Sequence, residues 1–125
     1  NYRYNLMDEH VRRFNAEVPQ IWQWDDHEVV NNWSPGKLLD QRYTLKDIHS
    51  LVNRGRQAWL EYAPMRWQSA EGGKRIYRQL SYGPLLDVFV LDMRSYRGAN
   101  DDNLGAAKPF LGREQLDWLK RELKA

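Results

Sequence analysis

The densest group of chemically useful side chains lies at positions 24–32, which read WDDHEVVNN. Four acidic or imidazole side chains follow one another there: Asp25, Asp26, His27 and Glu28. Carboxylate oxygens and imidazole nitrogens bind calcium, manganese, iron or zinc. The same groups suit phosphoryl transfer, in which metal ions polarise the phosphate and a histidine protonates the leaving oxygen. A second interpretation stays open, in which this stretch is a solvated turn or a helix cap.

A second polar group follows the most apolar run of the chain, residues 85–91. It contains Asp92, Arg94 and Arg97. The forked donors of an arginine suit a phosphate, so Arg94 and Arg97 are candidate phosphate contacts. The alternative is that Arg94 pairs with Asp92, or with the acidic stretch, and holds the turn.

The first half of the chain predicts two helices joined by a short strand and a long loop. Apolar spacing predicts a helix over 4–17, ended by Pro19, and alternation predicts a strand over 20–24. Residues 31–42 show no periodicity and predict a loop. A second helix is expected from an N-cap at Thr44 to residue 63, with Gly55 as a weak point worth about 1 kcal/mol.

The second half predicts two strands and a helix. A turn over 69–74 leads into a strand over 75–82, and the run over 85–91 predicts a strand buried on both faces. Gly83-Pro84 is too short for a parallel crossover, so the two strands should pair antiparallel. A loop over 98–112, with its tip at 100–103, precedes an amphipathic helix over 114–123 whose apolar face carries Leu116, Leu119 and Leu123. Since ligands gather at strand ends in mixed α/β folds, both polar groups stand where a site is expected.

Composition excludes several classes of protein. The 125 residues include no cysteine, which excludes disulfides, thiolate metal sites and a cysteine nucleophile. No apolar run is long enough to span a membrane, and the first residues show no signal-peptide pattern. The net charge of +2 gives no strong nucleic-acid signal. The length fits one domain or part of one.

Three segments taken together resemble the central part of the PhoD-like alkaline phosphatases and phosphodiesterases. They are the motif over 19–32, the run over 77–97, and the pattern Leu111-Gly112-x-x-Gln115-x-x-Trp118-Leu119. The resemblance covers residues 4–123, and the three motifs come in the family's order. It implies an α/β fold, a partial metallophosphatase-type mixed sheet flanked by helices, with residues 1–125 forming the central part of a single domain.

The resemblance also implies a function, the hydrolysis of phosphomonoesters and phosphodiesters with calcium and iron as metals, in a periplasmic or secreted protein. In that reading Asp26 is a metal ligand, with Asp25 as its alternate, and Asn31 or Asn32 offers an amide oxygen to calcium. His27 matches the histidine that assists the leaving group. Arg94 as a substrate contact follows from its charge and not from the motif.

The sequence also departs from the family pattern. An early metal-binding motif, Gly-Asp-x-x-Tyr-x-Asp, and the late histidines that complete the metal cluster are absent from these residues. We therefore expect the isolated chain to lack useful activity. Two other functions stay open: a non-catalytic module that binds a polyanion or a protein, and a structural piece that self-associates through open sheet edges.

Overall fold

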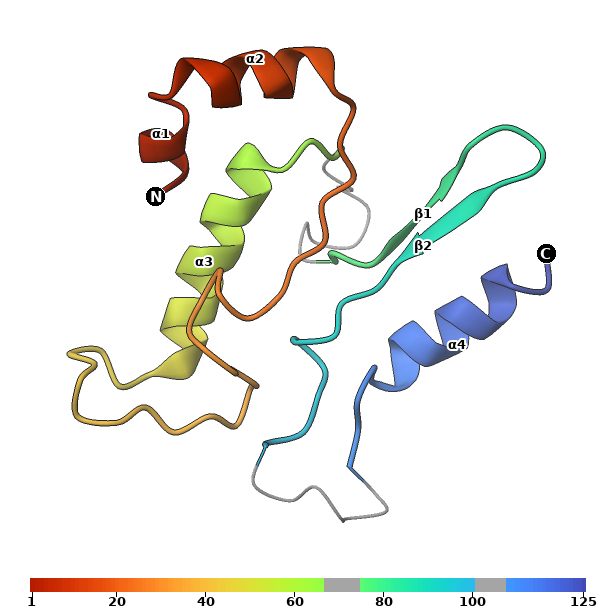
Figure 1. Cartoon of the computed structure of the whole chain (residues 1–125). Helices are drawn as coiled ribbons and strands as arrows, with labels where there is room; N and C mark the ends of the chain where they lie inside the picture. Colours follow the sequence, from red (N-terminus) through yellow and green to blue (C-terminus); the bar gives the residue numbers. More distant parts are fainter. Residues whose placement is uncertain (67–74, 101–107) are drawn as a thin grey trace.

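The computed structural model describes residues 1–66, 75–100 and 108–125. Its elements in chain order are α1 (Tyr2–Asn5), α2 (Glu9–Glu17), α3 (Ile48–Tyr62), β1 (Arg78–Ser81), β2 (Asp87–Val90) and α4 (Arg113–Glu122) (Figure 1). The expected partial α/β fold is confirmed. Within the described ranges the sheet has two antiparallel strands. No described helix is long and apolar enough to cross a membrane.

The single helix predicted over 4–17 is wrong, because the chain forms two helices there. The Asp8 carboxylate accepts hydrogen bonds from the backbone amides of His10 and Val11, so Asp8 caps a new helix. Neither α1 nor α2 contains a buried residue. Both lie over the carboxyl end of α3, where the Tyr2 ring stacks on Tyr62 at 5.0 Å (Figure 1).

The strand predicted over 20–24 is also wrong, although the segment keeps the alternation that suggested it. The carbonyl of Trp22 accepts a hydrogen bond from Arg78 Nη2 at 2.8 Å, so a side chain takes the place of a neighbouring strand. Side chains nevertheless alternate in burial, with Trp24 and Asp26 inside and Asp25 and His27 outside. This alternation decides which carboxylate faces the protein.

Helix α3 contributes four of the nine buried residues of the core cluster, more than any other helix or strand that the structure describes. Its cap is Asp47 and not Thr44, because the Asp47 carboxylate accepts from the amides of His49 and Ser50. The helix ends at Tyr62, just before Pro64, as the sequence predicts. Its buried residues Ile48, Val52, Trp59 and Leu60 belong to one cluster with Trp24, Val30, Trp33 and Ile76. Trp24 contacts the Trp33 and Trp59 rings edge-on at 5.4 and 6.2 Å.

Gly55 has a packing role that its helix propensity does not indicate. A Cβ atom added there would lie 2.6 Å from the Glu28 carbonyl oxygen and 3.1 Å from Val29 Cγ2. The absence of a side chain therefore lets the backbone of α3 approach the segment that carries Asp25, Asp26 and His27.

Strands β1 and β2 pair antiparallel, from Arg78 opposite Val90 to Ser81 opposite Asp87, which confirms the predicted hairpin. The prediction of a second strand buried on both faces is wrong. Strand β2 begins at Asp87, and Leu85 is 95% exposed in the turn that precedes it. Apolar composition alone therefore overestimated the burial of this run.

Helix α4 covers the hairpin through Trp118, whose ring contacts Tyr77 and Phe89 at 4.9 and 6.2 Å. The predicted apolar face is partly wrong, since Leu123 is exposed and the buried residues are Gln115 and Trp118. Residues 98–100 and 108–109 form the predicted loop. The turn predicted over 69–74 and the loop tip from residue 101 onward lie outside the described residues.

Candidate functional site

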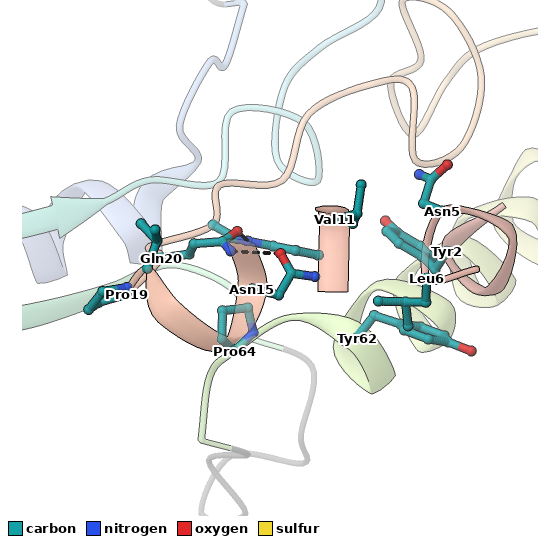
Figure 2. Close-up of a pocket in the computed structure, with 11 residues that line it drawn as sticks. Tyr2, Asn5, Leu6, Val11, Asn15, Pro19, Gln20, Tyr62 and Pro64 are labelled. Atoms are coloured by element: carbon teal, nitrogen blue, oxygen red, sulfur yellow. Dashed lines mark hydrogen bonds between the residues drawn. The ribbon is translucent and has the colours of Figure 1, made fainter. Parts of the chain in front are cut away.

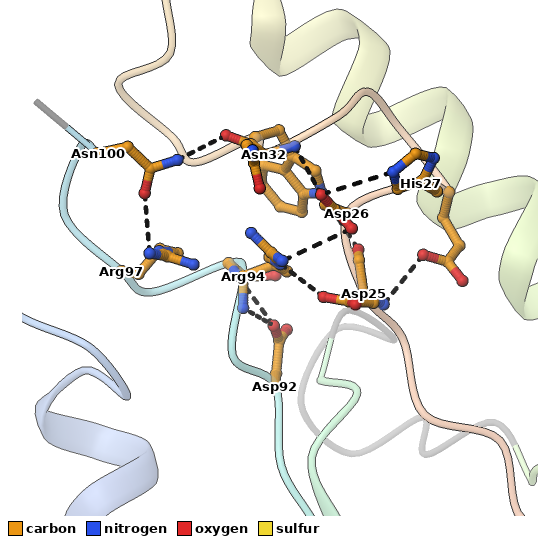
Figure 3. A network of polar contacts seen from close by, with 11 residues as sticks. Asp25, Asp26, His27, Asn32, Asp92, Arg94, Arg97 and Asn100 are labelled. Carbon is orange, nitrogen blue, oxygen red and sulfur yellow. Dashed lines mark hydrogen bonds and ion pairs between the residues drawn. The ribbon is translucent and has the colours of Figure 1, made fainter.

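The two polar groups found in the sequence meet in space, and Arg94 joins them. Arg94 Nε donates to Asp25 Oδ1 at 2.7 Å, and its Nη2 lies 3.6 Å from Asp26 Oδ1. Figure 3 shows the guanidinium reaching both carboxylates from the segment that follows β2. The contact spans 69 positions of sequence, so the fold alone creates it.

Burial divides the acidic stretch into an inner and an outer part. The side chain of Asp26 is 8% exposed, whereas those of Asp25 and His27 are 62% and 78% exposed. His27 Nε2 lies 3.9 Å from Asp26 Oδ2. The arrangement is therefore a solvent-facing imidazole beside a buried carboxylate.

Asp26 is held by two partners besides His27. Its Oδ2 accepts a hydrogen bond from the Asn32 amide at 2.6 Å, and Asn32 adopts a φ of 52°, which asparagine tolerates better than most residues. Burial raises the pKa of Asp26, but the Asn32 hydrogen bond and the charge of Arg94 outweigh it and leave that pKa below its ordinary value. The carboxylate is thus charged at neutral pH.

Of the two asparagines that follow the acidic stretch, only Asn32 contacts Asp26 in the described structure. Asn31 is exposed, and its carbonyl accepts a hydrogen bond from Lys37 Nζ. Asn32 closes the loop onto Asp26, and its carbonyl accepts from Asn100 Nδ2 at 2.9 Å. The role of Asn31 as a metal ligand stays a prediction.

Arg97 contacts the same loop indirectly. Its Nη2 donates to Asn100 Oδ1 at 2.8 Å, so Arg97 supports the side chain that reaches Asn32 (Figure 3). Sequence reasoning missed this bridge. It also missed the Asn32 contact to Asp26, which the Asp-to-Asn spacing alone does not reveal.

The surroundings of Arg94 support the interpretation that it holds the turn. Its side chain is 13% exposed, and the carboxylates of Asp25 and Asp26 face it. Its Nη1 is buried and has no hydrogen-bond partner among the described residues. A direct contact between Arg94 and a phosphate stays a prediction, and would require the Asp25 pair to open.

The metals implied by the resemblance do not fit the described residues by themselves. Within 1–66, 75–100 and 108–125, no three histidine, aspartate or glutamate side chains lie together as a metal site requires. The two oxygens of Asp26 face the Asn32 amide and Arg94. The donor set of the described residues is therefore incomplete for calcium or iron.

A cavity of about 370 Å³ lies elsewhere, between α1, α2 and the extended segment (Figure 2). Its polar side chains bond to one another, since Gln20 Nε2 donates to Asn15 and Trp22 Nε1 donates to Gln20. Among the described residues, those that line it include no acidic or basic side chain. This cavity therefore offers no group for phosphate chemistry, and the acidic stretch is the better candidate site.

Comparisons with known proteins agree with one another. A sequence model described as PhoD-like phosphatase matches residues 1–125. Alkaline phosphatase D of Bacillus subtilis (strain 168) is 31% identical over 128 residues, which cover 93% of this chain and 22% of that protein. A solved structure titled "Structure of PhoD" superposes with a TM-score of 0.74 at 30% identity, over 93% of this chain and 24% of the other. The chain thus spans under a quarter of the length of these relatives.

Proposed function

This chain belongs to the PhoD-like phosphatase family, and we propose that it contributes His27 and its neighbouring carboxylates to the hydrolysis of phosphomonoesters and phosphodiesters. The relatives support a phosphatase-type function. The observation that carries the proposal is the exposed imidazole of His27, whose Nε2 lies 3.9 Å from the buried and charged Asp26. In this pair, the His27 side chain is open to solvent, where it could transfer a proton, while the Asp26 side chain stays buried.

In the proposed reaction, water attacks phosphorus and gives a proton to solvent, while the bond to the leaving oxygen breaks and His27 donates a proton to that oxygen. Asp26 orients the loop that carries His27, because it is bonded to Asn32 and faces Arg94. Asp25 is the more exposed carboxylate and pairs with Arg94. These roles use only the residues of this chain.

We further propose that the whole protein is metal-dependent, with calcium and iron as the metals that the resemblance implies. Metals held in the complete site would supply neutralisation of phosphate oxygens and activation of water. Asp26, Asp25 and Asn31 are the residues of this chain proposed as ligands, and the isolated chain is proposed to be inactive. A periplasmic or secreted location and a phosphate-ester substrate belong to the same proposal.

Hydrolysis of a chromogenic phosphodiester by the full-length protein, supplied with calcium and iron, tests the proposal. We expect His27→Ala to lower kcat by about 100-fold. His10→Ala is the matched control, because His10 is an exposed histidine on α2 far from the site, and its rate should be unchanged. An inactive wild-type protein, or an unchanged rate in His27→Ala, contradicts the proposal.

The remaining candidate function is a non-catalytic module that binds a polyanion or a protein. It predicts binding that weakens with salt and needs no metal. Salt-dependent binding of a polyanion by a wild-type protein without hydrolysis would favour it.

A further inference from the structure

We propose that Gln115 is a positioning residue for the acidic stretch, and that it acts through Asp92 and Arg94. The inference rests on the proposed function for its effect on catalysis. Gln115 lies on α4, while the carboxylates that it positions lie some 90 positions earlier in the chain. No element of the sequence pattern assigns it a role of this kind.

Gln115 is completely buried and bonded at both ends of its carboxamide. Its Oε1 accepts from the Asp92 amide at 2.7 Å, and its Nε2 donates to the Asp92 carbonyl at 2.8 Å. The same Nε2 donates to the Leu111 carbonyl at 2.8 Å. One side chain thus holds both backbone polar groups of Asp92 and fixes the orientation of that residue.

Asp92 passes this orientation to Arg94. The buried Asp92 Oδ1 accepts from the backbone amides of Arg94 and Ser95 at 3.0 and 2.9 Å. These bonds shape the turn from which the Arg94 side chain leaves. Arg94 then reaches Asp25 at 2.7 Å and Asp26 at 3.6 Å.

The chemistry of glutamine suits this position. A buried peptide group needs a donor and an acceptor, and a carboxamide supplies both without a charge. Gln115 is three positions before Trp118, so the two side chains share a face of α4. Trp118 packs on the hairpin, and Gln115 bonds to the site segment. On this one face of α4, Trp118 therefore stabilises the fold, while Gln115 positions the segment that carries Asp92.

The test compares Gln115→Met with Trp118→Phe in the full-length protein. Methionine keeps the length of glutamine but removes all three hydrogen bonds, whereas Trp118→Phe changes the same helix face and leaves the Gln115 carboxamide in place. We expect Gln115→Met to lower kcat for the chromogenic phosphodiester by about 10- to 100-fold. KM should stay within about twofold, since the change displaces reacting groups. Trp118→Phe should lower the melting temperature and leave kcat unchanged.

Hydrogen exchange measured by mass spectrometry tests the same inference independently of enzymatic activity. The amide of Asn32 is bonded to Asp26, so residues 26–32 should exchange at least about tenfold faster in Gln115→Met. Trp118→Phe should leave that segment as in the wild type. Combining Gln115→Met with Arg94→Lys should add no further loss of kcat, because both changes break one chain of contacts.

The following results would overturn the inference or the proposed function. Equal kcat and equal exchange of residues 26–32 in Gln115→Met and the wild type overturn the inference, as do fully additive losses with Arg94→Lys. If Gln115→Met fails to fold, Gln115→Asn, which keeps a neutral carboxamide but is one methylene shorter and so withdraws it from the Asp92 backbone, takes its place in every measurement. A wild-type protein that hydrolyses nothing in calcium and iron refutes the proposed function, and hydrogen exchange alone then decides the inference.

Discussion

Replacing Gly55 by alanine should destabilise the protein, although helix propensity predicts the opposite. In an open helix, glycine to alanine adds about 1 kcal/mol of stability. Here the new Cβ would lie 2.6 Å from the Glu28 carbonyl oxygen, a backbone atom, and 3.1 Å from Val29 Cγ2. The Glu28 backbone must therefore move away by about 0.8 Å to reach ordinary contact.

The expected change in the free energy of unfolding is the difference between a steric cost and a gain in helix propensity. Forcing extra atoms into a packed region costs about 1–3 kcal/mol when backbone has to shift. With the propensity gain subtracted, we expect a net loss of as much as about 2 kcal/mol in the free energy of unfolding. Because Glu28 follows His27 directly, the same shift should lower kcat.

Urea denaturation and phosphodiester hydrolysis measure the two consequences on one protein preparation. Asn53→Ala is the control, because Asn53 is exposed two positions earlier in α3 and should gain a few tenths of a kcal/mol from propensity. A Gly55→Ala protein that gains about 1 kcal/mol and keeps its kcat would refute the reasoning, since it would show that α3 and the site segment do not touch through Gly55.

Three further expectations follow from the fold. Asp47→Ala should lower the free energy of unfolding by about 1 kcal/mol through loss of the α3 cap, and Thr44→Ala should not change it, as urea denaturation will show. Burial, and then the charge of Asp92, raise the pKa of Tyr96 from 10.0 to about 12. Its stabilising contribution is therefore complete below pH 10 and disappears as pH rises to 12, so unfolding free energies measured across this window should fall less steeply for Tyr96→Phe than for the wild type. If the chain self-associates, as its open sheet edges suggest, light scattering should show a mass that rises with concentration and falls when the exposed Leu85 and Leu86 are both changed to lysine.

Local signals in the sequence were sufficient for some elements. Pro64 ends α3 where the sequence predicts, because proline cannot continue a helix. The short connection between the two strands correctly predicts their antiparallel pairing, although it spans residues 82–86 and not Gly83-Pro84 alone. In each case the deciding interaction is between residues close in the chain.

Other predictions failed where distant residues decide the structure. The carbonyl of Trp22 is satisfied by Arg78, 56 positions away, so an extended segment forms without a strand. Asp8 caps α2, but the apolar spacing over residues 4–17 continues across it, so the sequence pattern did not show that a new helix starts there. Gln115 belongs to the third of the motifs that carry the family resemblance, but its bond to Asp92 is visible only in three dimensions.

The candidate site was also predictable only in part. The sequence alone shows that Asp25, Asp26 and His27 are neighbours, but it does not show which of the two aspartates is buried. Their difference in exposure comes from an extended backbone anchored by Trp24, and the junction with Arg94 comes from a contact across 69 positions.

The alternating burial from Trp22 to His27 sets a parity rule for this stretch. Since side chains of extended backbone point to opposite sides in turn, inserting one residue between Trp24 and Asp26, just before the turn over 26–30, would move Asp26 to the solvent side. Asp26 would then lose its place beside the Asn32 amide and Arg94, although every residue type was still present. The number of residues in this stretch should therefore tolerate less variation than their identity, and length changes should be accepted in pairs or outside it.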